Sequence, residues 1–96
     1  MLHIVNRSPF TSTALTECLK IIQPNDTLLL IEDAVIAATG KLGQQLECQQ
    51  DKFRIVVLMN DILARGLTHK VAALPKIDYS DFVVLTEQHQ SSITWS

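Results

Sequence analysis

Three short apolar segments constrain the fold of this chain more than any other feature of its sequence. They occupy residues 1–5, 27–31 and 53–59. Each is as long as a β-strand, and its apolar residues stand at consecutive rather than alternate positions, which is typical of strands buried on both faces. The intervening stretches, of roughly 20 residues, are long enough for the helical crossovers that join parallel strands. The segments therefore predict a parallel sheet with helices on both faces.

The stretch after the first segment has the apolar spacing of a helix. Ser8 is placed to cap this helix and Pro9 to begin it. Residues on one helical face then follow, namely Phe10, Ala14, Leu15, Cys18, Leu19 and Ile22. We expect residues 24–26 to end the helix, because proline, asparagine and aspartate favour turns.

Further elements continue the alternation of strands and helices. Helical pieces are predicted at 34–38, around 42–49, at 60–66 and from Ser80 onward, and residues 76–79 form a short fourth strand. The sequence thus predicts a small doubly wound α/β fold with a mainly parallel sheet. Because the chain has 96 residues, close to the length of one typical domain, residues 1–96 are expected to form a single domain.

Composition excludes several classes of protein. Hydrophobic residues make up 47% of the chain and charged residues 19%, which excludes a disordered chain. Its eight basic residues are scattered and the net charge is −2, so direct binding of nucleic acid is not expected. No apolar run is long enough to span a membrane, and no signal peptide is recognisable. The cytoplasm is the expected location.

The ends of the strands offer little recognisable chemistry. Ligands of open α/β sheets bind outside the carboxyl ends of the strands, but the first such loop, residues 6–9, lacks the glycines of a nucleotide site. Glu32, Asp33 and Asp61 could form a Mg²⁺ site like that of a phospho-receiver domain. That arrangement also needs acids after the first strand and a late lysine, which are missing. Helix capping and solvation explain these acids better, so no cofactor is expected.

The histidines do not predict a metal site. His3, His69 and His89 share no ligand spacing, so zinc is not expected. His3 lies within a predicted strand, which favours a hydrogen-bonded core histidine. His89 falls on the apolar face of the last helix, together with Phe82 and Leu85, and is expected to pack there.

The two cysteines leave one open question. They form neither a CxxC motif nor a disulfide framework. Cys48 lies in a polar stretch and is expected to have no role. Cys18 lies on the apolar stripe of the first helix, where packing is the simpler interpretation, because free cysteine is often buried. A sulfur-carrying thiol needs exposure and a lowered pKa, and this alternative for Cys18 stays open.

Four segments carry a family resemblance. They read MLHIVNRSPF at 1–10, LLLIEDAV at 28–35, DILARGL at 61–67 and IDYSDFV at 77–83, with Trp95 near the end of the chain. In content, order and spacing, the chain resembles the TusB/DsrH family of sulfur-relay subunits over essentially its whole length.

The resemblance implies a DsrE-like α/β fold and a role inside a larger assembly. Family members join TusC/DsrF-like and TusD/DsrE-like subunits in a heterohexamer, a dimer of heterotrimers. In the Tus version, persulfide sulfur passes through a cysteine of the D subunit to TusE. It is then used for 2-thiolation of the tRNA wobble uridine. In the Dsr version, the acceptor is DsrC and the pathway oxidises stored sulfur.

The resemblance also bears on Cys18 and on catalysis. It implies that the B/H subunit is not the main carrier and is not catalytic alone. DsrH-like members carry a cysteine on the first helix, and Cys18 matches its place, which makes it the persulfide candidate. The alternatives are a DsrH-like subunit in sulfur oxidation, a self-sufficient thiol carrier using Cys18, and a small-ligand domain using the strand-end loops.

The end of the chain is the remaining candidate region. Ile93 and Trp95 are large apolar residues close to the terminus, where little core is expected within reach. They are predicted either to contact a partner subunit or to fold back on the domain itself.

Overall fold

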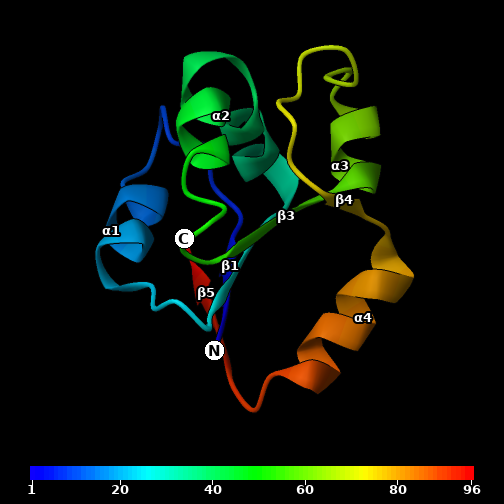
Figure 1. Cartoon of the computed structure of the whole chain (residues 1–96). Coiled ribbons are helices and arrows are strands. Elements are labelled where there is room, and N and C mark those ends of the chain that lie inside the picture. Colours follow the sequence, from blue (N-terminus) through cyan, green and yellow to red (C-terminus); the bar gives the residue numbers. More distant parts are fainter.

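A five-stranded, entirely parallel sheet forms the centre of the computed structural model, which describes residues 1–96 (Figure 1). Its strands are β1 (Leu2–Val5), β2 (Thr27–Leu30), β3 (Arg54–Leu58), β4 (Lys76–Ile77) and β5 (Ser92–Trp95). They lie side by side in the order β4-β3-β2-β1-β5. The predicted α/β class and parallel sheet are confirmed. The fifth strand was not predicted, because residues 92–95 were interpreted only as a tail.

Helices cover both faces of the sheet, but unequally. They are α1 (Ala14–Ile21), the 3-10 helix η1 (Glu32–Ala38), α2 (Gly40–Glu47), α3 (Met59–Ala64) and α4 (Tyr79–Gln88). The first four contribute to one apolar cluster, together with the strand residues Val5, Leu28 and Val57. Only α4 contributes to the second cluster, on the other face, where Leu85 packs with Leu2, Leu29, Val56 and others.

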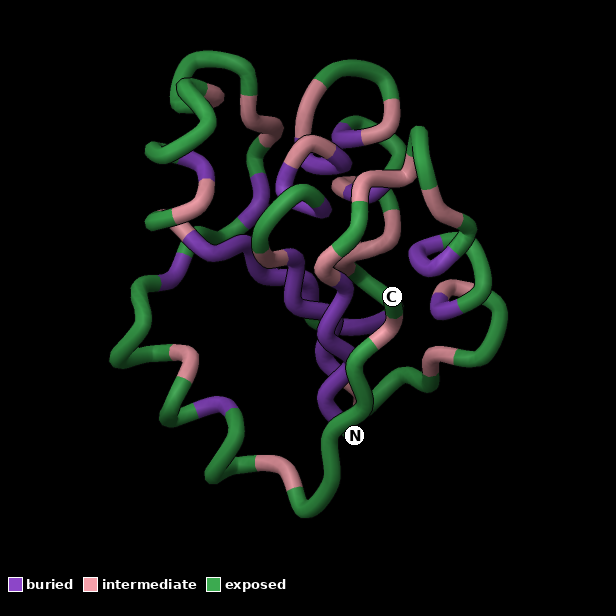
Figure 2. Tube along the Cα trace, turned by 180° about the vertical axis from the view of Figure 1, so that it is seen from behind, coloured by how far each residue is buried: buried purple, intermediate pink, exposed green.

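The strand positions explain the consecutive apolar residues in the sequence. Every residue of β1 and β2 is buried, and in β3 only Arg54 is exposed. Figure 2 shows these buried segments at the centre of the molecule, whereas the tube of α4 is mostly exposed. Burial on both faces thus produces the continuous apolar runs that predicted the strands.

The first helix begins later than the sequence predicted. Residues 8–12 form turns instead, in which the amides of Thr11 and Ser12 donate to the Ser8 carbonyl oxygen at 3.2 and 3.0 Å. The Ser8 hydroxyl also accepts from the Phe10 amide at 3.2 Å. These local bonds replace the first helical turn. Phe10 is therefore 76% exposed, and its assignment to the apolar stripe was wrong.

The last helix begins slightly earlier than predicted, at Tyr79. Asp78 is its N-cap, and the Asp78 carboxylate accepts a hydrogen bond from the Asp81 amide at 2.9 Å. The Asp81 carboxylate accepts one from the Asp78 amide at 3.4 Å. This capping box ends β4 after Ile77, so the strand is shorter than the predicted 76–79. None of the helices has the length and apolar character that crossing a membrane requires.

Candidate functional site

Cys18, the persulfide candidate, lies on the side of α1 that faces the sheet. Its side chain belongs to the first apolar cluster and has no exposed surface. Burial raises the pKa of the Cys18 thiol to about 12, and the negative charge of Asp26 acts in the same direction. None of the four surface hollows of the structure is lined by Cys18. In this structure the residue is a protonated, enclosed thiol.

Cys48 lies apart from Cys18, as the C-cap residue of α2. It is exposed, and both cysteines are free. The structure therefore pairs neither thiol with the other, in agreement with the absence of a CxxC motif.

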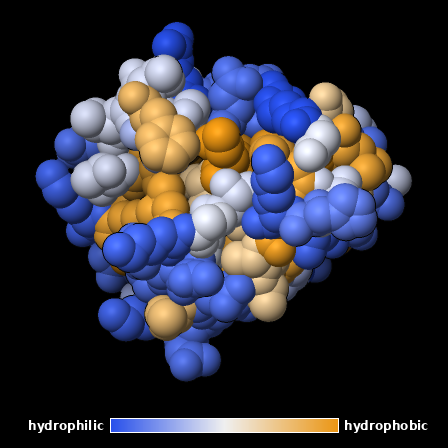
Figure 3. All heavy atoms as spheres, turned by 90° about the horizontal axis from the view of Figure 1, so that it is seen from above, coloured by the Kyte–Doolittle hydropathy of each residue, from blue (hydrophilic) through white to orange (hydrophobic).

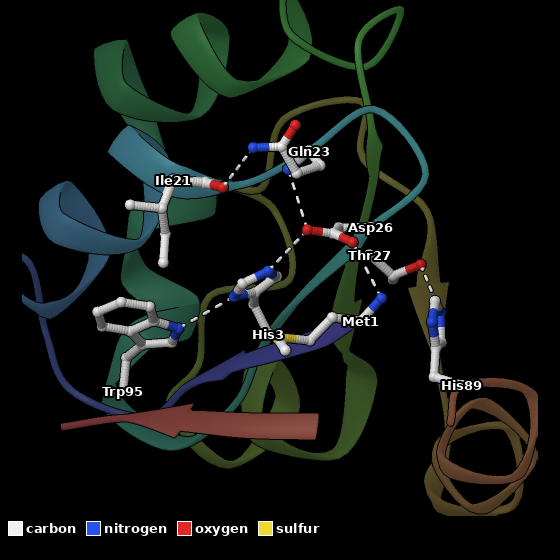
Figure 4. Close-up of polar contacts among 8 residues, drawn as sticks. All are labelled: Met1, His3, Ile21, Gln23, Asp26, Thr27, His89 and Trp95. Atoms are coloured by element: carbon white, nitrogen blue, oxygen red, sulfur yellow. Dashed lines mark hydrogen bonds and ion pairs between the residues drawn. The ribbon is translucent and has the colours of Figure 1, made fainter. Parts of the chain in front are cut away.

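A chain of hydrogen bonds lies close to α1, at the start of the sheet (Figure 4). His3 of β1 is 1% exposed. Its Nε2 lies 2.9 Å from Asp26 Oδ2, and the Trp95 indole N–H donates to its Nδ1 at 3.1 Å. The two rings are also stacked, with centroids 6.2 Å apart. The prediction of a hydrogen-bonded core histidine is confirmed.

Asp26 accepts several of these hydrogen bonds. Its Oδ1 accepts from the α-amino group of Met1 at 2.9 Å, and its Oδ2 accepts from the Gln23 amide at 2.9 Å as well as facing His3. Burial alone would raise the pKa of Asp26. The hydrogen bonds from Gln23, Met1 and His3 outweigh burial and lower that pKa to about 2.

No local pattern in the sequence indicates this group of residues. Asp26 was assigned only to the turn that ends the first helix, and Trp95 only to the tail. They meet because β1 lies between β2 and β5, with His3 beside Leu28 and Ile93 in the two neighbouring strands. Only the order of the strands could have revealed the contact.

His89 has a different role from the one predicted. It is the C-cap residue of α4, and its Nε2 lies 3.0 Å from Thr27 Oγ1. Burial lowers the pKa of His89, and the charge of the Met1 amino group adds to this effect, against the opposing charge of Asp26. The expected packing on the apolar face of α4 was wrong, because the helix ends at this residue and the ring turns to a polar partner.

The acidic residues at the other end of the sheet are held by an arginine. Arg65 contacts Asp33 at 3.0 Å and Asp61 at 3.6 Å. Asp61 Oδ2 also accepts from the Glu32 amide at 2.6 Å, and Glu32 has a positive φ of 50°. The structure contains no group of three His, Cys, Asp or Glu side chains placed to hold a metal ion. Neither η1 nor α3 has a side-chain N-cap, so ion pairing with Arg65, rather than the expected helix capping, accounts for Asp33 and Asp61.

A polar hollow of about 310 Å³ adjoins these acids. It is lined by Asn6, Arg7, Ser8, Thr11, Glu32, Asp33 and Ser96. No lining residue is apolar, so the hollow lacks the apolar walls that usually surround a small-molecule ligand.

Three large apolar side chains on the outer surface of α4 are exposed. Tyr79, Val83 and Val84 are 56%, 55% and 48% exposed, and Leu85 is the only buried residue of the helix. Other large apolar side chains are exposed as well, namely Phe10, Leu63 and Ile21, and Figure 3 shows hydrophobic areas among hydrophilic ones when the molecule is seen from above. Of the two tail residues, Trp95 points inward to His3, whereas Ile93 is 40% exposed.

Comparisons with known proteins agree with this architecture. A family model described as "DsrH like protein" matches residues 7–92. Protein TusB from Escherichia coli O81 (strain ED1a) and protein TusB from Escherichia coli O6:K15:H31 (strain 536 / UPEC) are each 35% identical over 96 residues. Each match covers 99% of this chain and 100% of the relative.

A solved structure shares the fold. The solution NMR structure of protein Tm0979 from Thermotoga maritima aligns with a TM-score of 0.68 and 21% sequence identity. The match covers 95% of this chain and 97% of that one. Fold and site together define a small, all-parallel α/β protein whose helical cysteine is enclosed in the core. Within that class, the chain belongs to the TusB/DsrH family.

Proposed function

We propose that this chain is the accessory, B- or H-type subunit of a sulfur-relay complex that passes persulfide sulfur toward 2-thiolation of the tRNA wobble uridine. The observation that carries the proposal is the 35% identity with protein TusB over 99% of the chain. The same family includes the DsrH-like subunits of sulfur oxidation. The TusB relatives favour the tRNA pathway over that alternative.

The surroundings of Cys18 support an accessory role. To take up sulfur, a cysteine thiolate must attack the outer sulfur of a donor persulfide, and the donor thiol must leave. With a pKa of about 12, on the order of one Cys18 thiol in 10⁵ is ionised at pH 7. The enclosed side chain also offers a donor no approach. We therefore assign Cys18 to packing, and the relayed sulfur to a cysteine of a TusD/DsrE-like subunit.

The exposed surface of α4 is the proposed contact for a TusC/DsrF-like or TusD/DsrE-like subunit. Tyr79 and Val83 are four residues apart and share one side of the helix. Leaving them in water forgoes the free energy of burying apolar surface, which association with a partner recovers. A TusE/DsrC-like acceptor is reached through the complex rather than by this chain.

We further propose that residues 1–96 act as one unit in the cytoplasm. Strand β1 begins at Leu2 and β5 ends at Trp95, and the two strands pair directly. Removal of either terminal segment would therefore remove one strand of the sheet. The proposed role in tRNA modification supports the cytoplasmic location.

Native mass spectrometry of the tagged chain, purified gently from its own host, tests the proposal. We expect an assembly that contains two other proteins of similar size in equal number. Their masses would also identify the Tus or the Dsr pathway. A lone monomer or a homodimer would contradict the subunit role and would favour the alternative of a self-sufficient sulfur carrier that uses Cys18.

A further inference from the structure

One histidine joins the last strand to the rest of the sheet. His3 lies in β1, Asp26 immediately precedes β2, and Trp95 is in β5. Figure 4 shows the imidazole of His3 between the carboxylate of Asp26 and the indole of Trp95. The contact between Trp95 and His3 spans 92 residues of sequence.

The two partners of His3 determine its protonation. An indole N–H can only donate, so His3 Nδ1 must carry a free lone pair to accept from Trp95 at 3.1 Å. A carboxylate can only accept, so Nε2 must carry the proton that faces Asp26 at 2.9 Å. The ring is therefore held as the neutral tautomer with its proton on Nε2.

Trp95 provides the one side chain of β5 that packs against the rest of the domain. Ser92, Ile93 and Thr94 are exposed, and Trp95 is the only residue of the strand that is partly buried and packed against the core. The strand pairs with β1 alone, at the edge of the sheet. The last backbone bond, from the Asn6 amide to the Trp95 carbonyl oxygen, is long at 3.4 Å.

We propose that His3 is a proton-dependent latch for β5. Addition of one proton to Nδ1 makes both ring nitrogens donors, and the indole N–H of Trp95 then faces a donor instead of an acceptor. The His3 ring keeps its bond to Asp26 as a charged pair. The indole N–H of Trp95 loses its acceptor and donates to water instead. Strand β5 consequently loosens from β1 when His3 is protonated and is held when His3 is neutral.

The charged groups around the ring act in both directions. The Asp26 carboxylate favours the protonated ring. The Met1 amino group, bound to the same carboxylate, opposes protonation. His89, held on Thr27, is the other titratable group nearby, and burial lowers its own pKa. Cys18, facing Asp26 from α1, is protonated and contributes no charge.

NMR spectroscopy of the ¹⁵N-labelled chain tests the latch without any substitution. Trp95 is the only tryptophan, so its indole N–H gives one resolved signal. At pH 8 we expect His3 to be the Nε2–H tautomer, with slow hydrogen exchange at the indole. Once acidification has protonated both ring nitrogens of His3, we expect the indole to exchange roughly tenfold faster. An Nδ1–H tautomer at pH 8, or indole exchange unaffected by protonation of His3, would overturn the proposal.

A matched pair of variants identifies the titrating group. Trp95 fluorescence should change when acidification protonates His3, both in the natural chain and in His69→Gln, which removes an exposed histidine far from the latch in sequence. The change should disappear in His3→Gln. If it persists in His3→Gln, or disappears in His89→Gln instead, the latch is not His3. The inference concerns only the intramolecular contacts of β5 and is independent of the proposed function.

Discussion

At the scale of single residues, the molecule contains one buried and one exposed thiol. Cys18 is fully buried, with a pKa raised to about 12, whereas Cys48 is exposed at the end of α2. Because both thiols belong to the same chain, the reaction of exposed Cys48 is an internal reference for the reaction of buried Cys18. The contrast makes chemical modification a direct test of whether Cys18 packs or carries sulfur.

We expect iodoacetamide at pH 8 to alkylate Cys48 readily and to leave Cys18 unmodified in the folded chain. Mass spectrometry of the digested protein would measure each site. In denaturant the two rates should become similar, because burial no longer protects the Cys18 thiol. Equal alkylation rates at Cys18 and Cys48 in the native chain would contradict burial of Cys18 and would support it as a sulfur carrier.

Asp26 makes the stability of the fold depend on pH in the acidic range. Its pKa falls from 3.8 to about 2 on folding, so its contribution is fully present above pH 4 and is lost as the pH falls through 2. We expect Asp26→Asn to lower the free energy of unfolding by about 1–2 kcal/mol at pH 7, measured in urea. The loss should shrink below pH 3.

The exposed carboxylate of Asp51 provides the control for this substitution. Asp51→Asn removes the same charge without removing a bond from His3 or Met1, and should leave stability nearly unchanged. A similar loss in both variants would mean that net charge, and not the hydrogen bonds of Asp26, is responsible.

At the scale of secondary-structure elements, the sequence predicted the strands that are buried on both faces. The interior strands β1, β2 and β3 are continuous apolar runs, since both of their faces are covered. Strand β5 has three exposed residues and one partner strand, so it leaves no such pattern. The start of α1 was missed because the Ser8 turn competes with the helix, a choice that local propensity does not decide.

The site was less predictable than the fold for a related reason. The burial of His3 follows from its place in an apolar strand, and this much was anticipated. Its partners Asp26 and Trp95 arrive from the turn before β2 and from β5. Their meeting depends on strand order, which apolar periodicity does not encode.

The capping box at the start of α4 allows a quantitative test at this scale. Asp78→Ala removes the carboxylate that accepts from the Asp81 amide at 2.9 Å. We expect it to cost about 1 kcal/mol of stability, as is usual for an N-cap. Ser80→Ala, at an exposed position of the same turn, should cost much less. Thermal unfolding would compare the two, and equal losses would contradict a specific role for the cap.

At the scale of the whole molecule, the two faces of the sheet are covered unequally. Four helices pack on one face, and α4 alone contributes to the cluster on the other. That single helix buries Leu85 and leaves Tyr79, Val83 and Val84 exposed. Three exposed apolar side chains thus lie together on the thinner side of the sheet, where we propose that the partner subunit binds.

Substitution of Val83 by glutamate should separate folding from assembly. Since Val83 is 55% exposed, the Val83→Glu chain should keep its circular dichroism spectrum and its melting temperature to within a few degrees. It should no longer co-purify with the two other subunits. Gln88→Glu adds the same charge at an exposed position on the same helix and should still assemble. Normal assembly of Val83→Glu would exclude this surface.

The order of the strands also has a consequence for how the chain folds. The β1–β5 pairing, with its Trp95–His3 contact 92 residues apart, closes almost the largest loop that this chain can form. Contacts of such separation form slowly, because the entropy of the whole loop is lost before they stabilise anything. Until β5 arrives, β1, an uncharged strand that is fully buried in the finished sheet, is an unpaired edge. In that interval the folding intermediate is prone to pair with other chains, so aggregation during refolding should depend on how quickly β5 docks.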